Sequence, residues 1–131
     1  MEPQTKEVTL QSKAKDFASD LKMFTGTSQY FQHPLVHNFK YTDGTRFFFN
    51  HCAGGAHWFK DIVATEIVDL MEIHDFLVIR LQVDNGKAEI EATNGNENRI
   101  LYSKKIAYTD AYPGTWEFYM QNMVFFLPSE Y

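Results

Sequence analysis

The pair Asn85-Gly86 constrains the fold of this chain more than any other sequence feature. It lies between residues 76–83, which begin apolar and then alternate, and residues 87–93, in which small or branched apolar residues alternate with charged ones. Asn-Gly favours the tight hairpin turn whose twist matches that of paired strands, and alternation indicates a strand with one buried and one solvated face. The sequence therefore predicts an antiparallel hairpin in this region.

Three segments are predicted as helices. Apolar residues recur at helical spacing from Leu10 to Phe24, and Thr9 is placed to cap the start of this helix. Helical spacing also runs from Trp58 to Leu70, which predicts a second helix. Residues 116–120 are predicted as a short amphipathic helix, and the polar residues 1–8 are expected to form a flexible N-terminus.

The remaining segments are predicted as strands. Asp43-Gly44 is interpreted as a hairpin turn between strands at residues 36–41 and 46–50, because glycine accepts the positive φ of tight turns. Residues 99–108 form a further strand, in which Lys104-Lys105 indicates a bulge or a sheet edge. Residues 123–127 are either a buried strand or the end of the short helix.

The order of these elements indicates an α+β fold. Strands joined by tight turns predict an antiparallel sheet of about five or six strands, with two to three helices packed on one face. A chain of 131 residues fits a single domain, residues 1–131, and buries enough surface to fold without a disulfide or a metal.

Charge and composition exclude several classes of function. A net charge of −5 argues against a nucleic-acid partner, because such binding depends on neutralising phosphates. The single cysteine excludes an internal disulfide and fits a reducing compartment. Neither a membrane-spanning apolar run nor a signal peptide is found. We therefore expect a cytoplasmic protein with no membrane partner.

The residues His51, Cys52, His57 and Asp61 form the clearest cluster of reactive groups. Adjacent strand residues point to opposite faces and only one cysteine is present, so the cluster is not predicted to bind metal, and no cofactor is expected. Cys52, His57 and Asp61 could act as nucleophile, base and orienting acid, with His51 as another candidate base and Asp43 as another candidate acid. A lone cysteine beside a turn is more often a small core residue.

Aromatic residues make up 16% of the chain and indicate a surface for association. In a strand at residues 46–50, Phe48 would face away from its neighbours, so one sheet face would expose aromatic side chains. Tyr41, Phe48, His51 and Trp58 are the candidate binding residues. We expect a homodimer formed through the sheet, because symmetric dimers are the commonest soluble assembly.

Five short motifs give the chain a resemblance to a known family. They are Phe24-Thr25-Gly26-Thr27, Tyr41-Thr42-Asp43-Gly44, Ala53-Gly54-Gly55-Ala56-His57-Trp58, Tyr108-Thr109-Asp110 and Leu127-Pro128-Ser129-Glu130-Tyr131. The chain resembles small bacterial proteins of unknown function that are often encoded on plasmids, prophages and other mobile elements. One departure follows the fourth motif, where this chain has Ala111-Tyr112-Pro113 and members usually have Phe-Pro. The resemblance implies an intracellular bacterial setting and no known activity.

Two functional hypotheses follow from these observations. The first is a non-enzymatic binding module of a mobile element, whose partner is another protein or a second copy of the chain. The alternative is a small hydrolase or transferase that uses Cys52, His57 and Asp61. The two differ in whether these three side chains meet in an accessible pocket.

Overall fold

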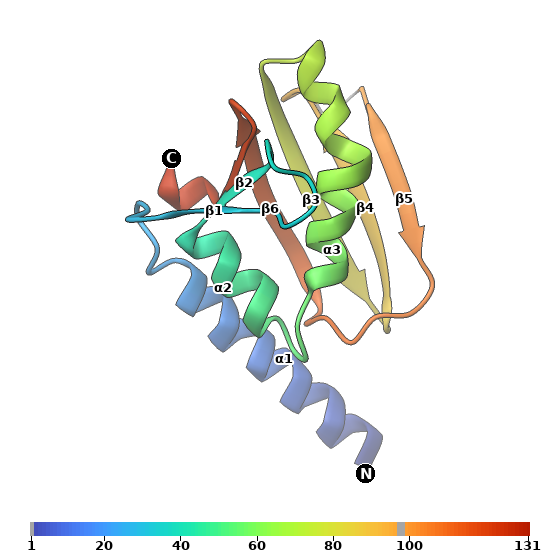
Figure 1. Cartoon of the computed structure of the whole chain (residues 1–131). Helices are drawn as coiled ribbons and strands as arrows, with labels where there is room; N and C mark the ends of the chain where they lie inside the picture. Colours follow the sequence, from blue (N-terminus) through green and yellow to red (C-terminus); the bar gives the residue numbers. More distant parts are fainter. Residues whose placement is uncertain (1, 97–98) are drawn as a thin grey trace.

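The computed structural model describes the backbone of residues 2–96 and 99–131, with side chains from Thr9 onward. Three α-helices lie on one face of a seven-stranded sheet (Figure 1). The strands are β1 (Tyr30–Gln32), β2 (Lys40–Thr42), β3 (Phe76–Asp84), β4 (Lys87–Thr93), β5 (Tyr102–Ile106), β6 (Gly114–Gln121) and β7 (Val124–Phe126). The helices are α1 (Glu2–Leu21), α2 (Asp43–His51) and α3 (His57–Ile62), with shorter helical turns at η1 (Val63–Ile67), η2 (Val68–Glu72) and η3 (Pro128–Glu130).

The sheet is mixed, with strand order β1-β2-β7-β6-β3-β4-β5. Every pair is antiparallel except β2 with β7, which is parallel. The predicted α+β class is therefore confirmed, but the prediction of five or six antiparallel strands was too low in number and missed the parallel pair. Three differences change the number: β1 was not predicted, β6 was predicted as a helix, and the strand predicted at residues 46–50 is part of α2.

The β3–β4 hairpin is confirmed. Asn85 and Gly86 adopt φ values of 53° and 73°, the positive angles that the predicted turn requires. The N–H of Thr109 donates a hydrogen bond of 2.9 Å to the carbonyl of Gly86, which ties the segment after β5 to this turn. The predicted strand at residues 99–108 is shorter than expected, and β5 lies at an edge of the sheet, as its two lysines indicated.

The predicted hairpin at Asp43-Gly44 is wrong, because both residues begin α2. Thr42 caps this helix, and its hydroxyl accepts a hydrogen bond from the N–H of Thr45 at 3.4 Å. The Thr45 hydroxyl in turn accepts from the N–H of Thr42 at 2.8 Å, which completes a capping box. The predicted strand at residues 46–50 is therefore helix as well, and the strand predicted at residues 36–41 is reduced to β2.

The predicted helix at residues 116–120 is also wrong. These residues belong to β6, a central strand paired with β3 and β7. Trp116, Phe118 and Met120 are buried, while Glu117 and Tyr119 between them are half-buried on the other face. This is the period of a strand and not of a helix. Of the two alternatives for residues 123–127, the strand is confirmed as β7.

The two long predicted helices are confirmed with different ends. α1 begins at Glu2, before the predicted cap at Thr9, and its side chains before Thr9 lie outside the described residues, so the expected flexibility of residues 1–8 stays a prediction. The second helix runs from His57 to Glu72 and changes from α-helix through a π turn to a 3-10 turn. In the described part of the chain, no helix has the length and apolar character needed to cross a membrane.

The core lies between the helices and the sheet and is dominated by aromatic rings. The ring of Phe118 on β6 contacts Phe48 on α2 and Phe125 on β7, with centroids 4.9 Å apart in both cases. Phe59 on α3 packs on the same ring at 5.2 Å. All four side chains are fully buried. Many of the aromatic residues that suggested a surface for association therefore pack in the core.

Candidate functional site

The predicted nucleophile lies in the core. Cys52 is fully buried at the C-terminal end of α2. Burial raises the pKa of its thiol to about 11, against the opposing effect of a hydrogen bond from the backbone of Tyr112. The thiol is therefore protonated at neutral pH and closed to a substrate. In the described part of the chain, no hydrogen bond joins Cys52 to His57 or Asp61, so the structure does not assemble the predicted catalytic group.

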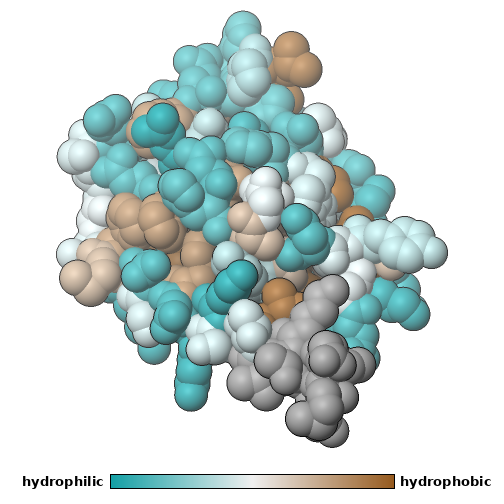
Figure 2. Space-filling view, turned by 90° about the horizontal axis from the view of Figure 1, so that it is seen from below, coloured by the Kyte–Doolittle hydropathy of each residue, from teal (hydrophilic) through white to brown (hydrophobic). Residues whose placement is uncertain are grey.

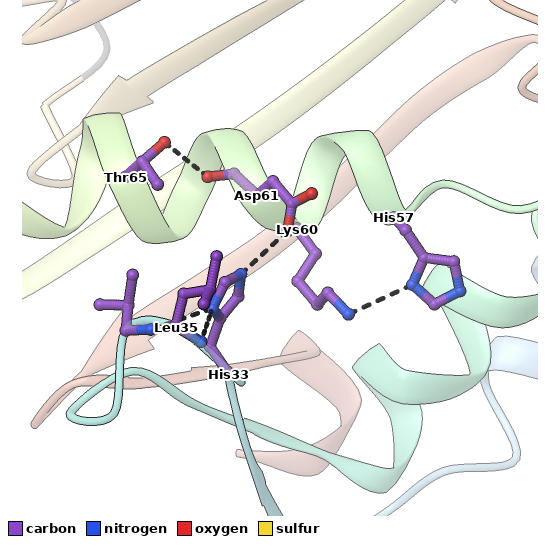
Figure 3. A network of polar contacts seen from close by, with 7 residues as sticks. His33, Leu35, His57, Lys60, Asp61 and Thr65 are labelled. Atoms are coloured by element: carbon purple, nitrogen blue, oxygen red, sulfur yellow. Dashed lines mark hydrogen bonds and ion pairs between the residues drawn. The ribbon is translucent and has the colours of Figure 1, made fainter.

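Asp61 instead contacts a histidine that the sequence reasoning did not select (Figure 3). His33 is 3% exposed, and its Nε2 lies 2.9 Å from Oδ1 of Asp61. Its Nδ1 accepts hydrogen bonds from the N–H groups of Leu35 and Val36, both at 3.1 Å. Because Nδ1 is an acceptor, the ring proton is on Nε2 and is donated to Asp61. No lone pair remains free, so His33 links the β1–β2 segment to α3 and cannot serve as a base.

His57 and Lys60 form a second contact on the same face of α3 (Figure 3). Nζ of Lys60 lies 3.2 Å from Nδ1 of His57 and 5.5 Å from the centroid of the Tyr41 ring. Partial burial lowers the pKa of His57, and the positive charge of Lys60 lowers it further. His57 is therefore uncharged at neutral pH, its Nδ1 accepts from Lys60, and its Nε2 carries the ring proton and can act as a donor. This face of α3 can hydrogen-bond a ligand, but the thiol of Cys52 is not part of it and lies in the core.

The four candidate binding residues do not form one surface. Phe48 is fully buried, which corrects its selection: it lies on a helix facing the sheet and not on an exposed strand. Tyr41 is half-buried and packs edge-on against Phe49 at 5.3 Å. His51 is exposed and lies 4.7 Å from the ring of Phe47. Trp58 lines a shallow pocket of about 560 Å³ beside the β3–β4 turn.

Three of the sequence motifs meet at the N-terminus of α2. Oε1 of Glu130 accepts hydrogen bonds from the Thr42 hydroxyl at 2.6 Å and from the N–H of Leu127 at 2.9 Å. Its Oε2 accepts from the N–H of Gly44 at 3.0 Å, in the first turn of the helix. A carboxylate is favoured there because the N–H groups of the first turn have no partner within the helix. The C-terminal motif therefore caps the Tyr-Thr-Asp-Gly motif.

The first motif secures the same helix end from the other side. The Thr27 hydroxyl accepts a hydrogen bond of 3.0 Å from the N–H of Asp43. Oδ2 of Asp43 accepts from the N–H of Ser28 at 2.9 Å and from its hydroxyl at 3.0 Å. The backbone hydrogen bond from Ser28 is the largest cause of the lowered pKa of Asp43. Asp43-Gly44 thus forms a contact point for two distant segments.

The other two motifs meet at the C-terminal end of α2. A Cβ atom on Gly54 would lie 2.7 Å from Oδ2 of Asp110, so this carboxylate would have to shift if another residue replaced the glycine. Gly55 has a φ of 111°, and its N–H donates to the carbonyl of Cys52 at 2.9 Å. The five motifs therefore hold the two ends of α2 in place. Their role in this structure is packing and capping.

A groove of about 1180 Å³ lies between α1 and the ends of the strands. It lies at the lower end of the molecule in Figure 1, the end seen in Figure 2, where hydrophilic residues surround small hydrophobic groups. Its apolar floor includes Ala14, Ala18, Val83, Ala88, Ile106 and Trp116. Its charged rim consists of Lys15, Lys87, Lys105, Asp84 and Glu89. No sequence pattern indicates this groove, because its residues come from five separate elements.

Comparison with known families decides which group of proteins this chain belongs to. Residues 15–131 match the model of a family of unknown function, DUF6876. The chain belongs to this family. The DUF6876 match contains all five motifs and most of the residues that line the groove. A search of curated proteins and a search of solved structures each returned no match. The family assignment therefore brings no activity with it, and the function must be argued from the geometry.

Proposed function

We propose that this DUF6876 protein is a non-enzymatic binding module that acts on another protein in the bacterial cytoplasm, in the service of a mobile element. The groove between α1 and the strand ends carries this proposal. Its volume of about 1180 Å³ is larger than most small-molecule sites, which measure about 300–1,000 Å³. An open groove of that size with an apolar floor and a charged rim is suited to a segment of a partner protein.

The chemistry of the described residues supports binding over catalysis. The one thiol is buried and protonated, and both nitrogens of His33 are engaged. No group of three or more His, Cys, Asp or Glu side chains in the described residues is placed to hold a metal ion. The resemblance to proteins of mobile elements supports the biological setting, since small proteins of such elements often act on host or element proteins.

Site-specific photo-crosslinking in the bacterial host tests this proposal. Benzoylphenylalanine replaces Tyr108, which lines the groove and is 90% exposed, or Met23, which is 80% exposed and does not line it. We expect a discrete crosslinked protein from position 108 and none from position 23. The crosslink should disappear when Ala18→Trp fills the groove. Absence of any crosslink at position 108, or identical products at both positions, would overturn the proposal.

A second candidate is the homodimer through the sheet, favoured by an aromatic cluster on the face opposite the helices. The ring of Tyr119 lies 5.0 Å from Phe76 and 5.9 Å from Phe126. Tyr131 covers Phe126 at 5.7 Å and is itself 78% exposed. Light scattering at micromolar concentration should then give a dimer mass that falls to the monomer in Tyr131→Glu. A monomer mass that holds as concentration rises would exclude this assembly.

A further inference from the structure

We infer that the groove between α1 and the strand ends binds an acidic amphipathic helix of the partner protein. This inference rests on the proposed binding function and adds the secondary structure and charge of the bound segment. Three observations carry it: the central strands of the floor have their backbone groups paired within the sheet, the rim in the described residues has three lysines with no carboxylate within ion-pair distance, and the volume fits a short helix.

The floor of the groove favours an occupant that satisfies its own backbone. Val83 is paired with Ala88 on one side and with Gly114 on the other, and Ala88 is also paired with Ile106. Their backbone groups are therefore used within the sheet ladder and cannot pair with an added strand. A helix bonds its own N–H and C=O groups and can present an apolar face to such a floor.

The flank formed by α1 permits close approach. Ala14 and Ala18 are four residues apart, so they lie on the same side of the helix, and both line the groove. Small side chains at this spacing let a second helix pack at the short end of the usual axis separation, about 8 Å. A helix about 10 Å wide would fill the groove over roughly 15 Å, or about ten residues.

The rim sets the charge of the occupant. In the described part of the chain, Lys15, Lys87 and Lys105 have no carboxylate within ion-pair distance. Two other basic residues on the same strands are paired, Lys104 with Glu66 and Arg80 with Glu117. The rim carboxylates are Asp84 and Glu89, and Glu89 already accepts a hydrogen bond from Ser103. In the described residues the rim has three lysines against two carboxylates, which lie opposite Lys87 and Lys105 in the strand pairs, so its net charge is +1 on a protein of net charge −5.

Selection of helical peptides against the full chain tests the inference. A phage library displays a helix of about 14 residues with its exposed positions randomised, and enriched peptides are measured by fluorescence anisotropy. We expect enriched sequences with apolar residues at i, i+3, i+4 and i+7 and with Asp or Glu on the flanks. Binding should be at least tenfold weaker to the triple variant Lys15→Glu, Lys87→Glu, Lys105→Glu.

Two matched controls distinguish an effect at the groove from an effect of net charge and from a disturbance of α1. The variant Lys13→Glu, Lys22→Glu, Lys40→Glu changes the net charge equally at exposed lysines outside the groove, and should bind within about twofold of the parent. Ala18→Trp should abolish binding, whereas Ser19→Trp places the same side chain on an exposed neighbouring position and should not.

The outcomes separate this inference from the proposed function. The acidic helix would be overturned by enrichment of neutral or basic peptides, by an equal loss of peptide affinity in both triple variants, or by no enrichment at all. Groove-specific crosslinks in the host would in that case still support the proposed binding function. Concentration-dependent dimerisation that Ala18→Trp abolishes and Ser19→Trp preserves would identify the occupant as a second copy and would also overturn the inference. If the groove-specific crosslinks were absent as well, both the inference and the proposed binding function would be overturned.

Discussion

Removing the carboxylate of Glu130 should destabilise the whole domain, because this side chain caps α2 from 86 residues away along the chain. Glu130→Ala removes the hydrogen bond to the N–H of Gly44 in the first turn of the helix, which by analogy with helix caps contributes about 1 kcal/mol. The loss of a negative charge near the helix N-terminus adds about 0.5 kcal/mol.

The buried partners of Glu130 raise this cost. Leu127 is 4% exposed, and its N–H loses its acceptor in the alanine variant, at a cost of about 1–2 kcal/mol. The Thr42 hydroxyl is less affected, because it also lies 3.2 Å from the Thr45 hydroxyl. We therefore expect Glu130→Ala to lower the free energy of unfolding by about 3 kcal/mol. Glu130→Gln keeps one acceptor oxygen and should lose about half as much.

Urea unfolding followed by circular dichroism measures these differences. Glu72→Ala is the matched control, since it removes an exposed carboxylate and should stay within about 0.5 kcal/mol of the parent. A loss below about 0.5 kcal/mol in Glu130→Ala would refute the capping role.

A double-mutant cycle with Gly44 makes the test specific. A Cβ atom on Gly44 would lie 2.8 Å from the carboxylate of Glu130 and 2.6 Å from Cδ1 of Leu127. Gly44→Ala should therefore be destabilising, although alanine is the better helix residue by about 1 kcal/mol. Its cost should be smaller when Glu130 is already alanine, because one of the two clashes is gone. Purely additive costs would show that the two residues act independently.

Three further predictions concern reactivity, pH and metal. The thiol of Cys52 should not react with a disulfide reagent in the folded protein at pH 8 and should react within seconds in urea; rapid labelling of the folded state would contradict its burial and raised pKa. Hydrogen bonds from Tyr102 and Lys104 lower the pKa of Glu66 below its ordinary 4.5, so the stabilising contribution of Glu66 is present above that pH and is lost as the pH falls below it. Stability measured from pH 6 to pH 3 should therefore fall less steeply in Glu66→Gln, and identical slopes would contradict the assignment. Elemental analysis after mild dialysis should find no stoichiometric zinc, whereas one zinc per chain that is lost in His57→Ala would show that the histidine and cysteine cluster had been misread.

Local sequence was sufficient to predict the elements whose conformation depends mainly on residues nearby in the chain. The turn at Asn85-Gly86 needs only residues that accept positive φ, and the helix from Leu10 to Leu21 needs only its own spacing. The burial of Cys52 also agrees with the sequence interpretation, in which a lone cysteine is more often a core residue.

Tertiary contacts decided the elements whose local signals were balanced. Asp43-Gly44 fits a hairpin turn as well as a helix start, and the helix forms because Thr27, Ser28 and Glu130 hold its first turn. Residues 116–120 have apolar side chains at spacings that suit either a helix or a strand, and β3 and β7 provide the partners that make them a strand.

The candidate functional surface depended entirely on tertiary structure. The sequence pattern indicated His57 and Asp61 as candidate site residues. The partner of Asp61 is instead His33, which lies 28 residues earlier and belongs to no motif or periodic pattern that would identify it. The groove joins α1 to the ends of β3, β4, β5 and β6. Periodicity reports how one segment divides its residues between core and solvent, and it contains no information about which distant segments then lie side by side. Sequence thus determined the elements with strong local signals, and only the packed fold determined which side chains meet at the surface.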